Sequence, residues 1–287
     1  MLFVEYAYPS AELRPFLYGY VQRTSEPDKP AIVEPVVGRA GSMLEFHFAD
    51  PFNVPAYGIE RLNLSVPITI IGPITARKVR IIIQGRVESL TVLFRPLGFF
   101  AHFGIPLASF AGTGIDGSGV LGAPILRLHE QLGNLALFAD RVRALDAFFT
   151  QKIRRFGALH PAHRALQLLG STSALRTLRN VSEEVGISTR QLERISLDLI
   201  GVTPKVFSRL SRFQKALRLR QTTDENWTWI AHAANYYDQT HMVREFREFA
   251  GDTPDRSIRE VSSDHLISFM MSPAARHRLK NKYASAL

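Results

Sequence analysis

The sequence contains no cysteine, and this absence removes several classes of function at once. Disulfide bonds, thiol catalysis and cysteine-based zinc sites all need a thiol that the chain lacks. No apolar run reaches the ~18 residues that a transmembrane helix requires, so no membrane partner is expected. The opening residues, MLFVEYAYPS, lack the charged and hydrophobic regions of a secretion signal. Together these features predict a cytoplasmic protein.

Acidic residues are scarce relative to basic ones. The 287 residues include 35 Lys and Arg against 26 Asp and Glu, which gives a formal net charge of +9. Residues 158–287 hold 19 basic and 13 acidic side chains (+6), whereas residues 1–157 hold 16 and 13 (+3). The length suggests two domains, and the charge favours nucleic acid as a partner of the second. A basic surface alone does not decide this, because most such surfaces are only solvated.

An internal repeat is the most informative feature of the C-terminal half. Residues 188–204, STRQLERISLDLIGVTP, align without gaps with residues 238–254, DQTHMVREFREFAGDTP. In the second copy, Met242, Phe246 and Phe249 recur at the spacing of a buried helical stripe. Each copy begins with a capping residue and ends with a glycine and a proline, so both are predicted to be short, capped helices.

Each capped helix follows another short segment with helical periodicity. These segments are residues 177–186 and 228–237, and they end at tight breaks at Gly186 and Asn235. Residues 204–221 join the two copies and have the pattern of a longer, basic helix. Helix, tight turn and helix, repeated on one connecting helix, predict two linked helix-turn-helix units.

Residues 160–262 resemble the DNA-binding domain of AraC-type bacterial transcription regulators. The motifs that carry the resemblance are YDQTHMVREF…G.TP in the second unit and ISTRQLER…GVTPK…SR..RFQKAL in the first. It implies double-stranded DNA as a partner, and RNA polymerase as another if the protein is an activator. Asn235 stands where the family usually has Gly, and we expect it to tolerate the required positive φ. Ser196 stands where an aromatic residue is usual, which predicts weaker packing of the first recognition helix.

The outward positions of the two capped helices supply the candidate DNA-binding residues. Two recognition helices on a rigid connection can enter successive major grooves, about 34 Å apart. Arg190 and Arg194 can pair with guanine, and Gln191 can address adenine. The candidate set is Ser188, Thr189, Arg190, Gln191, Arg194, Lys205, Arg209, Gln239, Thr240, His241, Arg244 and Arg247.

Not all of these candidates are expected to read bases. Lys205 and Arg209 are expected to contact the phosphate backbone. For Arg194 and Arg244, which occupy equivalent positions of the repeat, two interpretations stay open. They contact DNA, or they form ion pairs with acidic residues of the protein.

The first 115 residues have an extended rather than a helical pattern. In residues 42–48, Leu44, Phe46 and Phe48 alternate with Glu45 and His47, which predicts a half-buried strand. Further strands are predicted at residues 67–75, 78–85 and 89–98. Several short strands at this spacing predict a β-barrel or sandwich, and therefore an α+β fold for the whole chain.

Residues 92–112 resemble the cupin-like sensor domains of one branch of AraC-type regulators, which implies a small-molecule effector. Arg95 either pairs with an acidic effector or caps a turn. Residues 112–119 are predicted to be a linker loop. Helical residues 120–156 either pack against the sensor domain or form a homodimer. The predicted domains are residues 1–115 (sensor), 116–157 (helical linker or dimerisation segment), 158–262 (DNA-binding) and 263–287 (tail).

No arrangement of catalytic residues stands out, so an enzyme is not expected, nor is a cofactor. His47 and His102 are too far apart in sequence for a metal motif, so no metal is expected. Two alternatives to a regulator remain. One is a β-barrel enzyme or metal-binding protein with an accessory helical domain. The other is an interaction protein whose second unit has lost DNA binding, an idea suggested by Asn235, Glu245 and Glu248.

Overall fold

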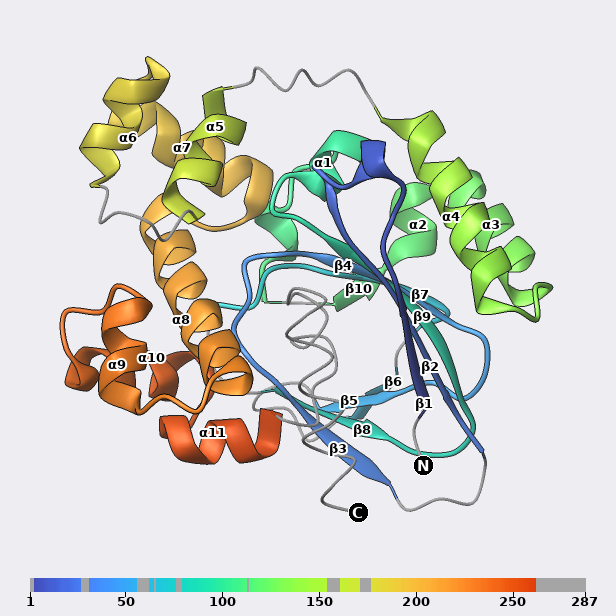
Figure 1. Cartoon of the computed structure of the whole chain (residues 1–287). Helices are drawn as coiled ribbons and strands as arrows, with labels where there is room; N and C mark the ends of the chain where they lie inside the picture. The colour runs from blue at the N-terminus through green and yellow to red at the C-terminus, as the bar shows by residue number, and fades with distance from the viewer. Residues whose placement is uncertain are drawn as a thin grey trace.

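The computed structural model has a β-rich N-terminal part and an all-α C-terminal part, as Figure 1 shows. The predicted α+β fold is therefore confirmed. The structure describes residues 3–26, 31–55, 62–64, 66–75, 79–112, 114–153, 161–170 and 177–261. The predicted tail, residues 263–287, lies outside the described residues.

Two antiparallel sheets form the N-terminal part. Within the described residues, one sheet has the order β1-β2-β9-β4-β7-β10 and the other the order β3-β8-β5-β6. Strands β4, β7, β8 and β9 confirm the four predicted strands. The strands are β1 (Phe3–Ala7), β2 (Leu17–Ser25), β3 (Ile32–Val36), β4 (Met43–His47), β5 (Asn53–Pro55), β6 (Leu62–Leu64), β7 (Ile68–Ile71), β8 (Val79–Ile83), β9 (Val87–Phe94) and β10 (Gly114–Asp116).

Strand β4 is buried on both faces, so its prediction as half-buried was wrong. Leu44 and Phe46 belong to the core shared with the covering helices. Glu45 and His47, on the other face, are each only 5% exposed. Burial raises the pKa of Glu45, but His47, Arg23 and Thr91 together lower it to about 2. Paired charges of this kind can be buried, which is why polar residues in alternation did not mark an exposed face.

Short helices complete the N-terminal part. They are η1 (Ala11–Leu13), α1 (Gly98–Phe103), η2 (Ala108–Phe110), α2 (Gly117–Leu121), α3 (Ala123–Gly133) and α4 (Phe138–Lys152). The predicted loop at residues 112–119 was wrong, because β10 pairs with β7 there and Asp116 caps α2 by accepting a hydrogen bond from the backbone N–H of Ser118. The apolar residues of α3 and α4, such as Leu128 and Phe149, pack in the same core as the sheet. This packing agrees with the first of the two alternatives given for residues 120–156, namely that they pack against the sensor domain.

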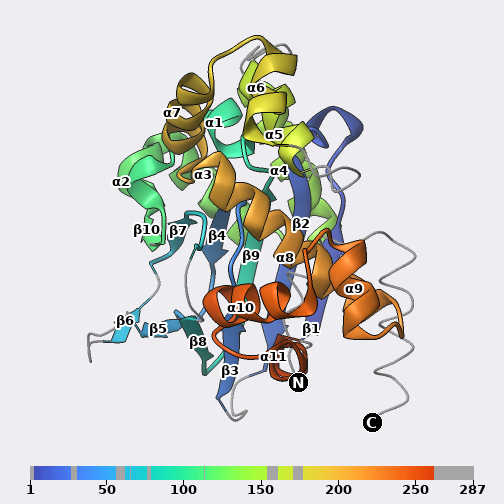
Figure 2. The same ribbon diagram turned by 90° about the vertical axis from the view of Figure 1, so that its left-hand side faces the viewer.

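The described residues of the C-terminal part are mainly helical. The helices are α5 (Pro161–Gly170), α6 (Leu178–Val185), α7 (Thr189–Ile200), α8 (Pro204–Thr222), α9 (Trp227–Ala233), α10 (Gln239–Phe249) and α11 (Pro254–Val261). Helix α8 connects the α6–α7 pair with the α9–α10 pair (Figure 2). The two turns contain Gly186 with φ 73° and Asn235 with φ 63°. The expected left-handed conformation of Asn235 is confirmed.

The two parts dock through the loop between β3 and β4. The backbone N–H of Gly38 donates to the carbonyl oxygen of Phe249, at the end of α10, at 2.8 Å. A Cβ atom at Gly38 would lie 2.9 Å from side-chain atoms of both Leu210 and Phe249, so only glycine permits this approach. Val37 and Ala40 join the same hydrophobic core as α8 and α10. The N-terminal part therefore holds the second helix pair directly.

Candidate nucleic-acid interface

Helix α7 presents one polar side outward and one apolar side inward. Ser188 caps the helix by accepting a hydrogen bond from the backbone N–H of Gln191. Leu192 and Ile200 are fully buried, whereas Arg190, Gln191 and Arg194 are exposed. Thr189 is half-buried and its hydroxyl lies 3.1 Å from that of Ser182 in α6. The outward positions that the repeat predicts for Arg190 and Arg194 are exposed in the structure.

Helix α10 has the same arrangement. Met242, Phe246 and Phe249 are 0% exposed, which confirms the predicted buried stripe. The side chains that face outward are Gln239, Thr240, Arg244 and Arg247. His241 is half-buried and its Nε2 lies 3.4 Å from Glu245, within the protein.

Arg194 and Arg244 have no ion-pair partner among the residues that the structure describes. Both are exposed, at equivalent positions of the repeat. The alternative that they are tied to acidic residues of the protein therefore finds no support in the described part of the chain. Lys205 is likewise exposed, in the first turn of α8, where Thr203 caps the helix.

Arg209 differs from the other candidates because it forms ion pairs inside the protein. Its Nε donates to Glu245 at 2.9 Å and its Nη1 donates to Glu248 at 2.9 Å. The hydrogen bonds with Glu248 and then with Glu245 raise the pKa of Arg209, outweighing the effect of burial. Arg212, one turn further along α8, donates to Glu245 at 3.0 Å. Arg209 thus fastens α8 to α10, and its guanidinium is already occupied.

Glu245 is the residue whose role the sequence interpretation missed. It is 1% exposed and lies between Arg209 and Arg212. A signal was present, because Glu245 stands three residues after Met242 and four before Phe249, inside the apolar stripe. A carboxylate there needs a cationic partner. Its burial also removes Glu245 as a reason to expect loss of DNA binding by the second unit.

The histidines of the N-terminal part have ordinary structural partners. His102 lies 2.7 Å from the carbonyl oxygen of Gly98, and burial lowers its pKa. His47 packs against Phe52 and lies 3.6 Å from Glu45. Within the described ranges, no three His, Asp or Glu side chains gather as metal ligands would. In the same ranges, every helix is too short or too polar to span a lipid bilayer.

A protein-family model described as a helix-turn-helix domain matches residues 181–260, from α6 into α11. Over these residues the C-terminal part of this chain is similar to a helix-turn-helix domain. Among curated proteins, none matches the sequence.

Solved structures similar to this chain include ToxT from Vibrio cholerae. One, at 1.65 Å resolution, is 8% identical to this chain and has a TM-score of 0.48. The aligned region covers 91% of this chain and 98% of the ToxT chain. Another, with a bound unsaturated fatty acid, is 10% identical, covers 82% and 96%, and has a TM-score of 0.45. A regulator with an AraC-type DNA-binding domain from Chromobacterium violaceum is 21% identical over 36% of this chain and 93% of its own, with a TM-score of 0.33. Likenesses this distant carry no functional assignment.

Proposed function

We propose that the protein is a sequence-specific DNA-binding transcription regulator that reads two successive major grooves with α7 and α10. The observation that carries this proposal is the equivalence of the two helices. Each is capped, each buries an apolar stripe, and each directs outward arginines that have no ion-pair partner among the described residues. Helix α8 connects the two. The match of residues 181–260 to a helix-turn-helix domain supports the same conclusion.

The outward side chains divide into those that read bases and those that bind phosphate. Arg190 and Gln191 stand in the first turn of α7, which enters the groove first, so they read base edges, together with Gln239 and Thr240 of α10. The remaining side chains bind phosphates or support the first turns, namely Ser188, Thr189, Arg194, Lys205, His241, Arg244 and Arg247. Arg209 is left out because Glu245 and Glu248 hold it.

The N-terminal part acts as the effector domain. Its loop at Gly38 is hydrogen-bonded to the end of α10, so a ligand that changes this docking changes the position of a recognition helix. Because α2, α3 and α4 share the core of the sheet, we assign residues 116–153 to this domain. We further propose that the protein forms a homodimer through the exposed side chains of Leu126 and Leu137. If it is an activator, it also contacts RNA polymerase.

Selection of binding sites in vitro, followed by mobility-shift assays at two salt concentrations, tests the proposal. Arg190→Ala is expected to relax preference at one base pair and to weaken the selected site by about 1–3 kcal/mol. Lys205→Ala is expected to weaken all sites alike and to reduce the salt dependence. Arg127→Ala, which removes an exposed charge from α3, is the matched control. Folded protein that binds no DNA at low salt contradicts the proposal.

A further inference from the structure

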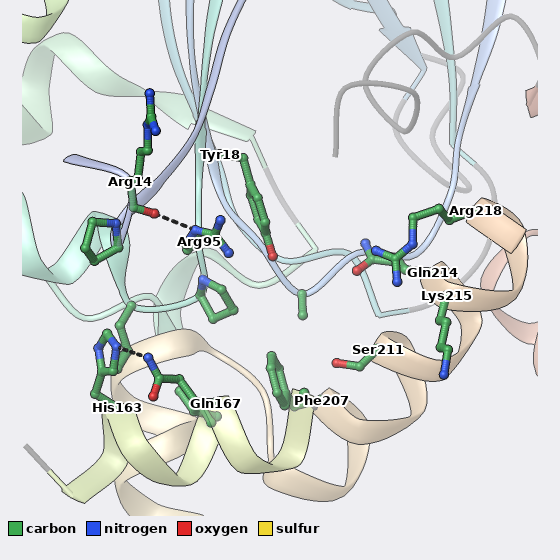
Figure 3. Close-up of a pocket in the computed structure, with 16 residues that line it drawn as sticks. Arg14, Tyr18, Arg95, His163, Gln167, Phe207, Ser211, Gln214, Lys215 and Arg218 are labelled. Carbon is green, nitrogen blue, oxygen red and sulfur yellow. Dashed lines mark hydrogen bonds between the residues drawn. The ribbon is translucent and has the colours of Figure 1, made fainter. Parts of the chain in front are cut away.

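A cleft of about 440 Å³ lies between the two parts of the molecule (Figure 3). The N-terminal part contributes Arg14, Pro15 and Tyr18, from the end of η1 into β2, together with Ala40 and with residues 95–97, between β9 and α1. The C-terminal part contributes α5 and α8. The volume falls within the range of small-molecule sites, roughly 300–1,000 Å³. No part of the proposed DNA-binding surface lines it.

Positive charge from both parts converges on this cleft. Arg95, from the N-terminal part, and Arg218, from α8, direct their guanidinium groups into it on either side of Tyr18, whereas the side chain of Arg14 points away (Figure 3). Lys215 adds a third cation to the lining. No Asp or Glu is found among the described residues that line the cleft.

Arg95 is held in place for such a role. Its Nε donates to the carbonyl oxygen of Arg14 at 2.8 Å, and its guanidinium carbon lies 4.4 Å from the centre of the Tyr18 ring. These two contacts fix the plane of the guanidinium while they leave its terminal nitrogens facing the cleft. Arg95 therefore performs the turn-capping role expected of it and can still bind an anion.

Two of the cations in the lining, Lys215 and Arg218, repel one another. Burial, and then the charge of Arg218, lower the pKa of Lys215. A ligand with two or more negative charges would offset this repulsion more completely than a ligand with one, since like charges close together destabilise each other. A small apolar part of the lining is formed by the buried side chains of Phe207, Leu166 and Leu97. The lining also contains Ser211 and Gln214, whose side chains can form hydrogen bonds with a ligand.

We propose that this cleft binds a small organic anion with at least two negative charges, a polycarboxylate or a phosphate ester, held between Arg95 and Arg218. Guanidinium groups suit this ligand because they bind carboxylate and phosphate oxygens in a bidentate manner. The ligand joins the N-terminal part to α8, the helix that carries both helix-turn-helix units. This last consequence rests on the proposed function, whereas the binding does not.

Isothermal titration calorimetry of the full chain tests the binding with four probes. Citrate and glucose 6-phosphate represent the two sources of charge, inorganic phosphate lacks an organic body, and decanoate is a long-chain monocarboxylate. We expect citrate or glucose 6-phosphate to bind with a submillimolar Kd and more tightly than the other two probes. Binding by neither of them, tighter binding of decanoate, or equal binding of inorganic phosphate would overturn the proposal.

Substitutions locate the site. Arg95→Gln and Arg218→Gln are each expected to weaken binding of the bound probe at least about tenfold, the loss of one charge-assisted hydrogen bond. Arg127→Gln removes an equal charge far from the cleft and should leave Kd unchanged. Thermal denaturation of each variant shows whether it is folded. A folded Arg95→Gln or Arg218→Gln variant that binds like the unaltered chain overturns the proposal.

A mobility-shift assay with and without the probe separates the two proposals. Because linkage is reciprocal, the factor by which the probe changes the Kd for DNA equals the factor by which DNA changes the Kd for the probe. A chain that binds the probe but no DNA refutes the regulator and leaves the cleft assignment intact. A chain that binds DNA but no multiply charged probe refutes the cleft assignment alone.

Discussion

Helices α7 and α10 present similar outward surfaces, yet they are held in place differently. In α10, the Phe246 ring packs against those of Phe213 and Trp227, with centroid distances of 4.9 and 5.7 Å. The equivalent residue of α7 is Ser196, which is 1% exposed and whose hydroxyl has no hydrogen-bond partner in the described part of the chain. The two copies of the repeat therefore have similar outward polar surfaces, whereas the residues that pack beneath the two helices differ.

The charged contact between helices shows the same difference. Glu245 ties α10 to Arg209 and Arg212 of α8, whereas the equivalent residue of α7 is Ile195. Of the buried residues of α7, Leu192 lies in a separate, smaller cluster with α5 and α6, whereas Ile200 joins the same core as α8 and α10. We infer that α10 is the more rigid reading helix and that α7 opens at a lower free-energy cost.

The largest effect is expected for Phe246→Ala. Removal of a fully buried aromatic ring leaves a cavity and should lower the free energy of unfolding by about 3–5 kcal/mol. Chemical denaturation of the full chain measures it. Ser196→Ala, at the equivalent position, is the control and should cause no loss. Equal losses at the two positions would show that the helices are held alike.

A smaller loss is expected for Glu245→Gln. This change leaves two arginines without their buried counter-charge, and because their side chains are 25% and 21% exposed, we expect a loss of about 2 kcal/mol. Glu248→Gln, which alters a 46% exposed partner of Arg209, should cost less than about 1 kcal/mol. Chemical denaturation measures the free energy of unfolding of both variants. A similar loss for the two would contradict the conclusion that Glu245 holds α10 to α8.

The fold of the C-terminal part could be predicted from the sequence because its signals are local. In each helix-turn-helix unit, the capping residue, the buried stripe at helical spacing and the glycine or asparagine of the turn lie close together in the sequence. The fastening of α8 to α10 could not, since Arg209 and Glu245 are 36 residues apart and no spacing connects them. The burial of Glu45 was missed for the same reason, because its cationic partner Arg23 lies 22 residues away on β2. Arg95 is a third case: the hydrogen bond from its Nε to the carbonyl oxygen of Arg14 accounts for one of the two roles that the sequence left open, and we propose the other for its terminal nitrogens.

A gain in stability is expected for Ser196→Ala. Loss of a buried hydroxyl without a partner, together with the higher helix propensity of alanine, should raise the free energy of unfolding by about 0.5–1 kcal/mol. Native-state hydrogen exchange should show slower exchange in α7 and little change in α10. A variant that is less stable than the parent would mean that the hydroxyl has a favourable interaction after all.

The smallest effect is expected for Asn235→Gly. The φ of 63° suits both residues, so the free energy of unfolding should change by less than about 0.5 kcal/mol. Asn235→Val, which disfavours this conformation, serves as the control and should cost clearly more. If the glycine variant is instead destabilised as strongly as the valine variant, the Asn235 side chain supports the turn.

Hydroxyl-radical footprinting of the full chain on a selected DNA site tests the central claim most directly. Two helices that read successive grooves should protect two segments per bound chain, on one face of the duplex and about one helical turn, or 10 base pairs, apart. The Arg190→Ala variant should weaken protection mainly in the segment that α7 contacts. A single protected segment per chain, or none with folded protein at low salt, would contradict the account.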